Sequence, residues 1–505
     1  MMRRYRPAIL ISLLCFSFCL LVKSADAMPT DGPAEDGTLP ALTAIAGRGM
    51  MDSPAYGYLT ELSDTVGARV TGTPQGDRAI EWGLAKMKSL GLENVRAESF
   101  SVWRGWTRIS AAAELVAPGR RRLTVDSMGW AGSTPRGGVE AEIVVVNSLA
   151  LETEIKENSS HWAGKILLVV RGSGGGQGRG GFLEFPKFLE AAAKAHATGI
   201  ISGQGGRGSA GMNMTHTGIL GFSTSTELPV VSMTGEDREL IERLLHRGNA
   251  VRIRLDVQNR FTDGPVKSAN VVGEIRGGKF SEQIVVVGAH LDSWDLADGA
   301  TDNGTGSACT LGAAAAILRA GVKPERTIRF VLFTGEEQGL LGSFAYVKQH
   351  QAEMKNHVAA IVQDNGQGPV NSFDLGGHSD LIPAVAKFAD ALQSFGVFTT
   401  DDEVEFGTDT GPFIVAGLPG INMGQDSPEY RYTHHSAADT HEKVKPEILA
   451  RNATLMGLTA FWIASRPERL ATPWAPEKTA HMLVEKKQDD FLKAIGEWPF
   501  GNLGE

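Results

Sequence analysis

The chain has 505 residues, of which 42% are hydrophobic and 21% charged, so a packed globular protein is expected and a disordered or coiled-coil chain is not. Its 49 basic and 58 acidic residues give a net charge of −9, which argues against a protein that binds nucleic acid by neutralising phosphates. At ~150 residues per domain, this length predicts about three structural units.

The N-terminal segment has the form of a secretory signal peptide. Residues 1–7 carry three arginines, an apolar run follows over Ala8–Val22, and residues 25–27 (Ala-Asp-Ala) have the pattern that signal peptidase cuts. The apolar run is shorter than the ~20 residues that a membrane-spanning helix needs. We therefore predict a signal peptide over 1–27 with cleavage after Ala27. The protein is then secreted or periplasmic and is not stably inserted in a membrane.

The segment 28–138 is expected to form the N-terminal part of a catalytic domain. Arg78–Lys88 has apolar residues at helical spacing and ends before Gly91, which is typical of a helix terminus. Val95–Val102 follows and reads as a strand.

The segment 139–262 reads as a separate α/β module inserted into a larger domain. Its expected elements are a strand over Lys165–Val170, a helix over Glu184–His196, a strand over Gly199–Ser202 and a helix capped by Thr234. The Gly-rich stretch Gly172–Gly181 lacks the Gly-Lys-Ser/Thr ending of a phosphate-binding loop, so a flexible loop is favoured there.

Strands and helices alternate through 263–470. The expected strands are Ile284–Gly288, Thr327–Phe333 and His357–Val362, and the expected helices are Ser307–Leu318, Leu340–Val347 and Asp380–Phe395. This alternation predicts an α/β fold with a mixed, largely parallel sheet sandwiched by helices. The segment 471–505 is a C-terminal extension with one helix candidate, Met482–Ile495, and no evident chemistry.

Each of these three strands runs directly into residues that can bind a metal. His290 and Asp292 follow the first strand, Glu336 and Glu337 follow the second, and Asp364 follows the third. In open α/β sheets, ligands bind in the crevice at the carboxyl ends of the strands. The sequence therefore predicts a site at this edge of the sheet.

The spacing of these residues suits a division of roles. His290 and Asp292 are two apart, so in an extended chain they point to the same face, where the carboxylate can orient the imidazole. Asp302 opens a helix and could be only a cap, so a metal-binding role for it depends on its neighbours. Of the adjacent Glu336 and Glu337, one can bind metal while the other takes a proton from water.

The available side chains favour zinc over a serine nucleophile. His434 and His435 lie near the C-terminus, and together with His290 and the carboxylates they suit one or two zinc ions with an open position. The segment 377–381 (Gly-His-Ser-Asp-Leu) lacks the second glycine of a nucleophile elbow, which disfavours a serine hydrolase.

The motifs resemble a known family. The ordered series is His290-x-Asp292, Asp302-Asn-Gly-Thr-Gly, Gly335-Glu336-Glu337, Asp364 and His435-Ser-x-x-Asp439-Thr440. It is similar to the co-catalytic zinc exopeptidases of peptidase family twenty-eight, which include bacterial aminopeptidases and glutamate carboxypeptidase. The segment 139–262 resembles a protease-associated domain. The resemblance implies the zinc exopeptidase fold with that domain inserted.

The family pattern also implies roles for individual residues. His290 and Asp364 would bind one zinc ion, Glu337 and His435 would bind a second, and Asp302 would bridge the two. Asp292 would orient His290, and Glu336 would act as general base. His434 stands where some relatives have a tyrosine that steadies the oxyanion, and Asp409 falls at a step that supports the ligands in relatives, where a purely structural loop is equally compatible.

The resemblance implies an exported dinuclear zinc exopeptidase that hydrolyses short peptides or dipeptides. Aminopeptidase or dipeptidase action is favoured, and carboxypeptidase action stays open. A single-zinc acyltransferase similar to glutaminyl cyclase and a non-catalytic peptide-binding or receptor-like relative are the other readings. The expected partner is a short peptide and not a nucleic acid. A homodimer stays open, because the sequence does not determine the oligomeric state.

Overall fold

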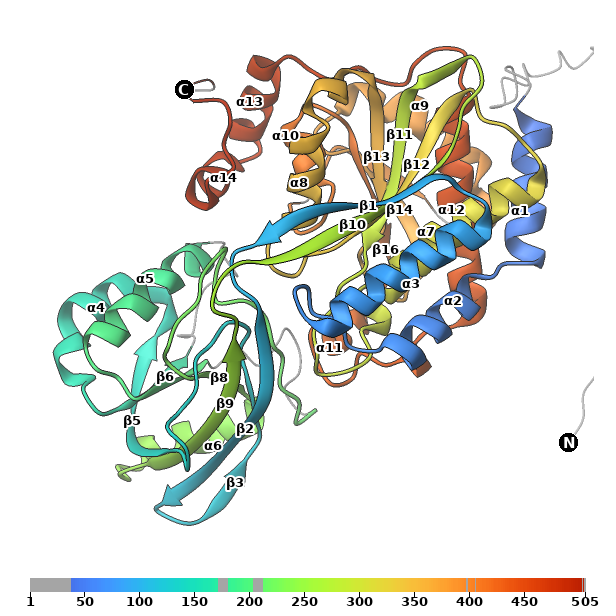
Figure 1. The fold of residues 1–505 in the computed structure, drawn as a ribbon. Helices are drawn as coiled ribbons and strands as arrows, with labels where there is room; N and C mark the ends of the chain where they lie inside the picture. Colours follow the sequence, from blue (N-terminus) through green and yellow to red (C-terminus); the bar gives the residue numbers. More distant parts are fainter. Residues whose placement is uncertain are drawn as a thin grey trace, which may run out of the picture.

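The computed structural model describes residues 38–170, 180–202, 212–396, 398–404, 406–501 and 503. Within these ranges the chain forms two units, each built around its own eight-stranded sheet (Figure 1). The larger unit lies at the upper right of the figure and the smaller unit at the lower left. The long strands β1 (Glu93–Val102) and β10 (Val266–Ile275) run between them. The predicted signal peptide and most of the stretch Gly172–Gly181 lie outside the described residues.

The sheet of the larger unit is mixed, with parallel strands at its centre. Its spatial order is β1, β10, β12 (Arg326–Phe333), β11 (Phe280–His290), β13 (His357–Val362), β16 (Gly420–Gln425), β14 (Val370–Asp374) and β15 (Thr399–Asp401). β11 is parallel to both β12 and β13, whereas β10 is antiparallel to β12 and β14 is antiparallel to β16. The predicted mixed α/β sheet is confirmed.

Helices cover both faces of this sheet. They are α1 (Leu39–Met51), α2 (Ala55–Glu61), α3 (Pro74–Leu90), α7 (Thr305–Ala320), α8 (Leu341–Gln349), α9 (Ile382–Ala391), α10 (Gly411–Val415), α11 (Tyr430–Thr433) and α12 (Pro446–Ser465). Successive side chains of β11 point to opposite faces. Val285 and Val287 therefore join the core that contains α7 and α12, while Val286 packs in a second core with Tyr346 of α8.

The smaller unit has a sheet whose middle strands are parallel. Its spatial order is β3 (Arg121–Leu123), β2 (Trp106–Ala117), β9 (Arg252–Phe261), β5 (Val139–Asn147), β6 (Ile166–Val170), β7 (Gly199–Ser202), β8 (Val230–Met233) and β4 (Val125–Ser127). The helices α4 (Leu151–Asn158), α5 (Gly180–Lys194) and α6 (Gly235–His246) belong to this unit. The Thr234 hydroxyl accepts a hydrogen bond from the Asp237 amide, which is the cap predicted for α6.

The sheet of the smaller unit begins earlier in the chain than the predicted module. Strands β2, β3 and β4 all precede residue 139, and β2 pairs antiparallel with β9 from Trp106 opposite Phe261 to Ala117 opposite Arg252. This sheet therefore extends from 106 to 261. Local periodicity cannot reveal a pairing between segments so far apart in sequence, which explains the later boundary expected from the pattern.

The C-terminal extension differs from its prediction. The expected helix Met482–Ile495 is two helices, α13 (Pro476–Glu485) and α14 (Asp489–Ile495). Lys487 between them has a φ of 57°, in the left-handed region, which interrupts a right-handed helix.

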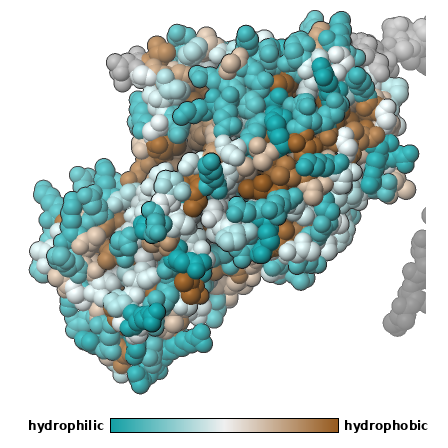
Figure 2. Space-filling view, viewed as in Figure 1, coloured by the Kyte–Doolittle hydropathy of each residue, from teal (hydrophilic) through white to brown (hydrophobic). Residues whose placement is uncertain are grey.

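The surface of the molecule is mainly polar in the view of Figure 2. Hydrophilic residues cover most of this face, and hydrophobic residues gather in a band across the larger unit (Figure 2). Among the described residues, no helix combines the length and the apolar character needed to cross a membrane.

Candidate metal centre

The carboxyl ends of β11, β12 and β13 meet at one edge of the larger sheet. Because β11 lies between the other two strands and is parallel to both, the residues that follow these strands come together. His290 is the last residue of β11, Glu336 and Glu337 follow β12, and Asp364 follows β13. The predicted convergence of these residues is what the structure shows.

His290 is held with one ring nitrogen facing the carboxylates. Its Nδ1 lies 3.0 Å from the backbone carbonyl of Asp292 and 3.6 Å from the Asp292 carboxylate, so the carbonyl is the closer partner. Its Nε2 lies 3.1 Å from Asp364 Oδ1 and 3.3 Å from Asp302 Oδ1. Residue 292 thus contacts the imidazole more closely with its main chain than with the side chain for which the orienting role is predicted.

Asp302 stands between two histidines. Its Oδ1 faces His290, while its Oδ2 lies 3.4 Å from His435 Nε2. The Asp439 carboxylate accepts hydrogen bonds from the backbone amides of Thr301 and Asp302 and so fixes this loop. One carboxylate therefore presents a different oxygen to each side of the site.

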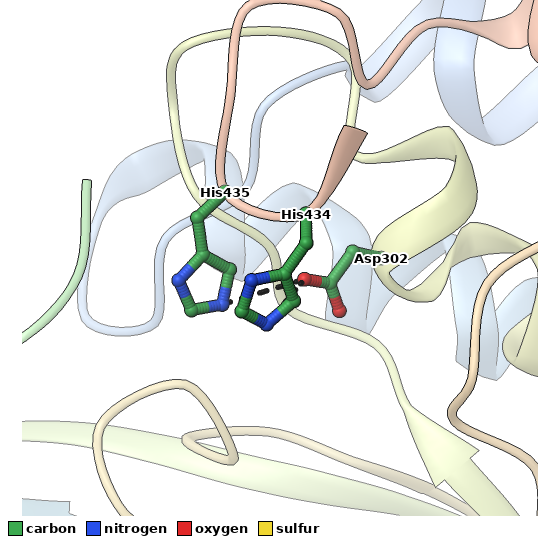
Figure 3. A group of neighbouring side chains, drawn as sticks. All are labelled: Asp302, His434 and His435. Carbon is green, nitrogen blue, oxygen red and sulfur yellow. Dashed lines mark ion pairs between the residues drawn. The ribbon is translucent and has the colours of Figure 1, made fainter. Parts of the chain in front are cut away.

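The second side of the site is formed by Glu337, His435 and His434. Glu337 Oε2 lies 2.9 Å from His435 Nε2. Figure 3 shows both imidazoles beside the Asp302 carboxylate, with His434 Nε2 at 3.9 Å from Asp302 Oδ2. The two rings stack with centroids 3.7 Å apart, and the His434 side chain is 47% exposed. His435 is thus less exposed than His434 and closer to Asp302, and its ligand role stays a prediction.

Glu336 faces the same group from the side of His290. Its Oε2 lies 3.8 Å from His290 Nε2, and its side chain is 11% exposed. Burial raises the pKa of Glu336 well above its usual range, and the charges of Asp364 and Glu337 add to this effect while His290 opposes it. The carboxyl group therefore lies beside the candidate ligands while still reaching solvent.

The buried polar atoms fit a cationic group. Among the described residues, Asp302 Oδ2, Glu337 Oε1 and Asp292 Oδ2 are buried without a hydrogen-bond partner. Burial and neighbouring carboxylates also raise the pKa of Glu337 well above its usual range. Buried carboxylate oxygens that lack a hydrogen-bond donor are costly unless a cation balances their charge. Imidazole and carboxylate ligands without a thiolate suit zinc.

Two residues support the loop after His290 through contacts that the sequence does not indicate. Arg69 is fully buried and donates hydrogen bonds to the backbone carbonyls of Leu291, Asp298 and Gly299, in the loop that joins His290 to Asp302. An arginine in an irregular segment has no periodicity or spacing that marks this role. Asp439 belongs to the His-Ser-x-x-Asp motif, but its hydrogen bonds with the backbone of Thr301 and Asp302 join segments far apart in the chain.

Asp409 lies close to the same group. Burial raises its pKa to about 7; His290 and a hydrogen bond with Ser343 oppose this shift, while the charges of Asp364 and Asp292 add to it. Asp409 therefore interacts electrostatically with the candidate ligands, and a supporting role for it stays a prediction.

Known proteins share this sequence and fold. Residues 270–460 match peptidase family M28. The chain is 30% identical over 436 residues to carboxypeptidase Q of Pongo abelii, covering 85% of this chain and 89% of that protein. A peptidase M28 precursor from Shewanella amazonensis SB2B superposes with a TM-score of 0.76 at 31% identity, covering 86% of this chain and 99% of that one.

A more distant structure shares the architecture. The zinc aminopeptidase BSAP from Bacillus subtilis superposes with a TM-score of 0.62 at 23% identity, covering 83% of this chain and 96% of that one. At this level of identity the likeness concerns the fold. The family match and the nearer relatives confirm the resemblance seen in the motifs: the chain belongs to peptidase family M28.

Proposed function

We propose that the protein is a dinuclear zinc exopeptidase that hydrolyses short peptides or dipeptides. The observation that carries this proposal is the Asp302 carboxylate, which directs one oxygen to His290 and the other to His435. His290 and Asp364 would hold one zinc ion, Glu337 and His435 the other, and Asp302 both. Membership of family M28 and the zinc aminopeptidase among its structural relatives support this assignment.

Glu336 is proposed as the general base. Bound zinc supplies Lewis-acid chemistry, polarising a peptide carbonyl and making water a stronger acid. Glu336 lies beside the proposed ligands, and the family pattern assigns Glu337 and not Glu336 to the metal. The Glu336 carboxylate can therefore accept the proton of the attacking water and return it to the leaving amine.

His434 is proposed to steady the oxyanion that develops on the substrate carbonyl. It borders Asp302 at 3.9 Å and is 47% exposed, so its ring can reach both the site and a bound peptide. Oriented donors of this kind stabilise the charge of the transition state. His434→Phe should then lower kcat while zinc content stays unchanged.

The end preference is the part of the proposal that one peptide series decides. We propose aminopeptidase or dipeptidase action. Because the relatives are named carboxypeptidase Q, the alternative is a carboxypeptidase that requires a free C-terminus. The same tripeptide is supplied in free, N-acetylated and C-amidated forms, and products are identified by mass spectrometry. Cleavage of the acetylated form would contradict the preference for a free amino terminus.

Zinc analysis on the same preparation separates an enzyme from a binding protein. Two zinc ions per chain with turnover support the proposal, whereas bound zinc without turnover on any peptide favours the receptor-like alternative.

We also propose export with removal of residues 1–27, which N-terminal sequencing of the mature protein tests: a chain that begins at Met28 is expected.

A further inference from the structure

The smaller unit contacts the metal centre through the segment His216–Thr217. The backbone amide of Thr217 donates to the carbonyl of His435 at 2.9 Å, and a β-bridge joins His216 to Ser436. The ring Nδ1 of His216 lies 2.7 Å from the carbonyl of His434. This segment therefore forms a short strand-like pairing with the loop that carries both histidines.

The same segment meets the ring of His435. The Nδ1 of His435 lies 3.3 Å from the Thr217 carbonyl, while the Nε2 of His435 faces Glu337 and Asp302. A histidine that binds metal through one nitrogen is oriented by a hydrogen bond from the other, often to a backbone carbonyl. His290 receives this support from Asp292 of its own loop, whereas His435 receives it from the smaller unit.

Arg108 joins this segment to the larger unit. It lies on β2, and its guanidinium forms a two-pronged ion pair with Asp295, at 3.0 Å from Nε and 2.8 Å from Nη2. Nη2 also donates to the Thr217 hydroxyl at 2.9 Å. The Arg108 side chain is 10% exposed, and Asp295 belongs to the loop that joins β11 to Asp302. A two-pronged, mostly buried pair of this kind is strong and geometrically specific.

We propose that the smaller unit is part of the metal centre, with Arg108 as a positioning residue that acts through Thr217 on His435. It fixes the Thr217 carbonyl relative to the loop of Asp295, and so fixes the ring of His435 in the orientation that binds metal. The proposal rests on the proposed dinuclear zinc site. It assigns the smaller unit a role in holding the ion at His435 and Glu337, and no role in holding the ion at His290 and Asp364.

Zinc binding tests this inference apart from activity. The metal-free full chain is titrated with Zn²⁺ in calorimetry, and wild type should show two binding steps. In Arg108→Met, one step should weaken by about 10- to 100-fold while the other stays within about twofold, as is typical when the partner that orients a ligand is lost. Arg108→Lys should not restore the step, because one ammonium cannot reproduce the fork that holds Asp295 and Thr217.

The controls separate this role from general damage. Arg252→Met removes another arginine of the smaller unit, one paired with Glu140 at 3.0 Å, and should leave both steps unchanged. Circular dichroism reports whether each variant is folded. Should Arg108→Met fail to fold, Asp295→Asn replaces it, because this variant removes the charge with little change in shape and should weaken the same step.

The outcomes distinguish the two proposals. Two unchanged zinc affinities in folded Arg108→Met, or in Asp295→Asn where that variant replaces it, overturn the inference. Equal weakening of both steps overturns it as well, because a selective hold on His435 predicts a selective loss. A wild-type chain that binds no zinc refutes the proposed function itself.

Discussion

Replacement of Arg69 tests whether a buried cation holds the loop beneath the metal centre. Its guanidinium donates to the carbonyls of Asp298 and Gly299 at 2.7 Å each, and also to that of Leu291. The bonds to Leu291 and Gly299 are fully buried. In Arg69→Met these two buried carbonyls lose their hydrogen-bond donor, which costs ~1–3 kcal/mol for each carbonyl. We therefore expect the free energy of unfolding to decrease by about 4 kcal/mol. That is a large share of the ~5–15 kcal/mol typical of a folded protein.

Two further variants calibrate this number. Arg69→Lys keeps a positive charge and up to three donors, so it should lose about half as much. Arg319→Met removes an arginine that pairs at 3.0 Å with Asp52 on the surface, where both side chains are more than a third exposed. An exposed pair contributes ~0–1 kcal/mol, so this control should remain close to wild type.

Urea unfolding measures the effect without interference from metal. Unfolding is followed by tryptophan fluorescence and by far-UV circular dichroism with a chelator present, so that loss of zinc does not contribute to the difference. Because the chain has two units, the two signals need not coincide, and each transition is analysed separately. An Arg69→Met variant within about 1 kcal/mol of the Arg319→Met control would refute the reasoning.

Three other predictions concern the site and the core. Glu336→Gln should lower kcat by at least ~100-fold while zinc content by mass spectrometry equals that of wild type, and loss of zinc would contradict its role as base. Asp302→Ala should bind neither zinc ion tightly in the same measurement, since both proposed sites share this carboxylate. Burial lowers the pKa of His357 to about 4 in the folded chain, against ~6.5 when unfolded. Below about pH 6.5 the unfolded chain therefore binds a proton that the folded chain does not, so stability is full above that pH and falls as pH decreases toward 4. In His357→Gln the urea concentration at the unfolding midpoint should change less with pH between about 4 and 6.5 than in wild type. An equal dependence on pH in the two proteins would contradict the assignment.

The strands that carry the ligands are predictable because each one contains an apolar run shortly before its ligands: Ile284–Val287, Phe330–Phe333 and Val358–Val362. Residues 357–362 are all buried in β13, and the same holds for β12, so hydrophobic runs marked them without any knowledge of their partners. Because the three strands are parallel neighbours, His290, Glu337 and Asp364 meet at one edge of the sheet. This part of the site follows from local pattern and a general rule of sheet topology.

The remaining parts depend on contacts that local pattern does not encode. β2 joins the sheet of the smaller unit through its pairing with β9, and Arg108 on β2 reaches Thr217 and Asp295 from a position that looks like any charged strand residue. Arg69 contacts backbone carbonyl groups, which every residue has, so no side-chain motif in the sequence indicates its partners. Residues that belong to a motif of metal-binding side chains can be predicted from the sequence. Residues whose partners are backbone groups cannot.

The C-terminal extension packs at the junction of the two units, although its own sequence carries no evident chemistry. The Phe491 ring of α14 lies 5.6 Å from the ring of Phe222, which belongs to the smaller unit. Phe222 covers Gly339, where a Cβ would overlap its ring, and the Gly339 amide donates at 2.7 Å to the carbonyl of Glu336. The extension, the smaller unit and the turn that carries the proposed base therefore pack in one continuous contact. Together with the ion pair between Arg108 and Asp295, this contact places the smaller unit against the larger unit at two separate points, one beside His435 and one beside Glu336.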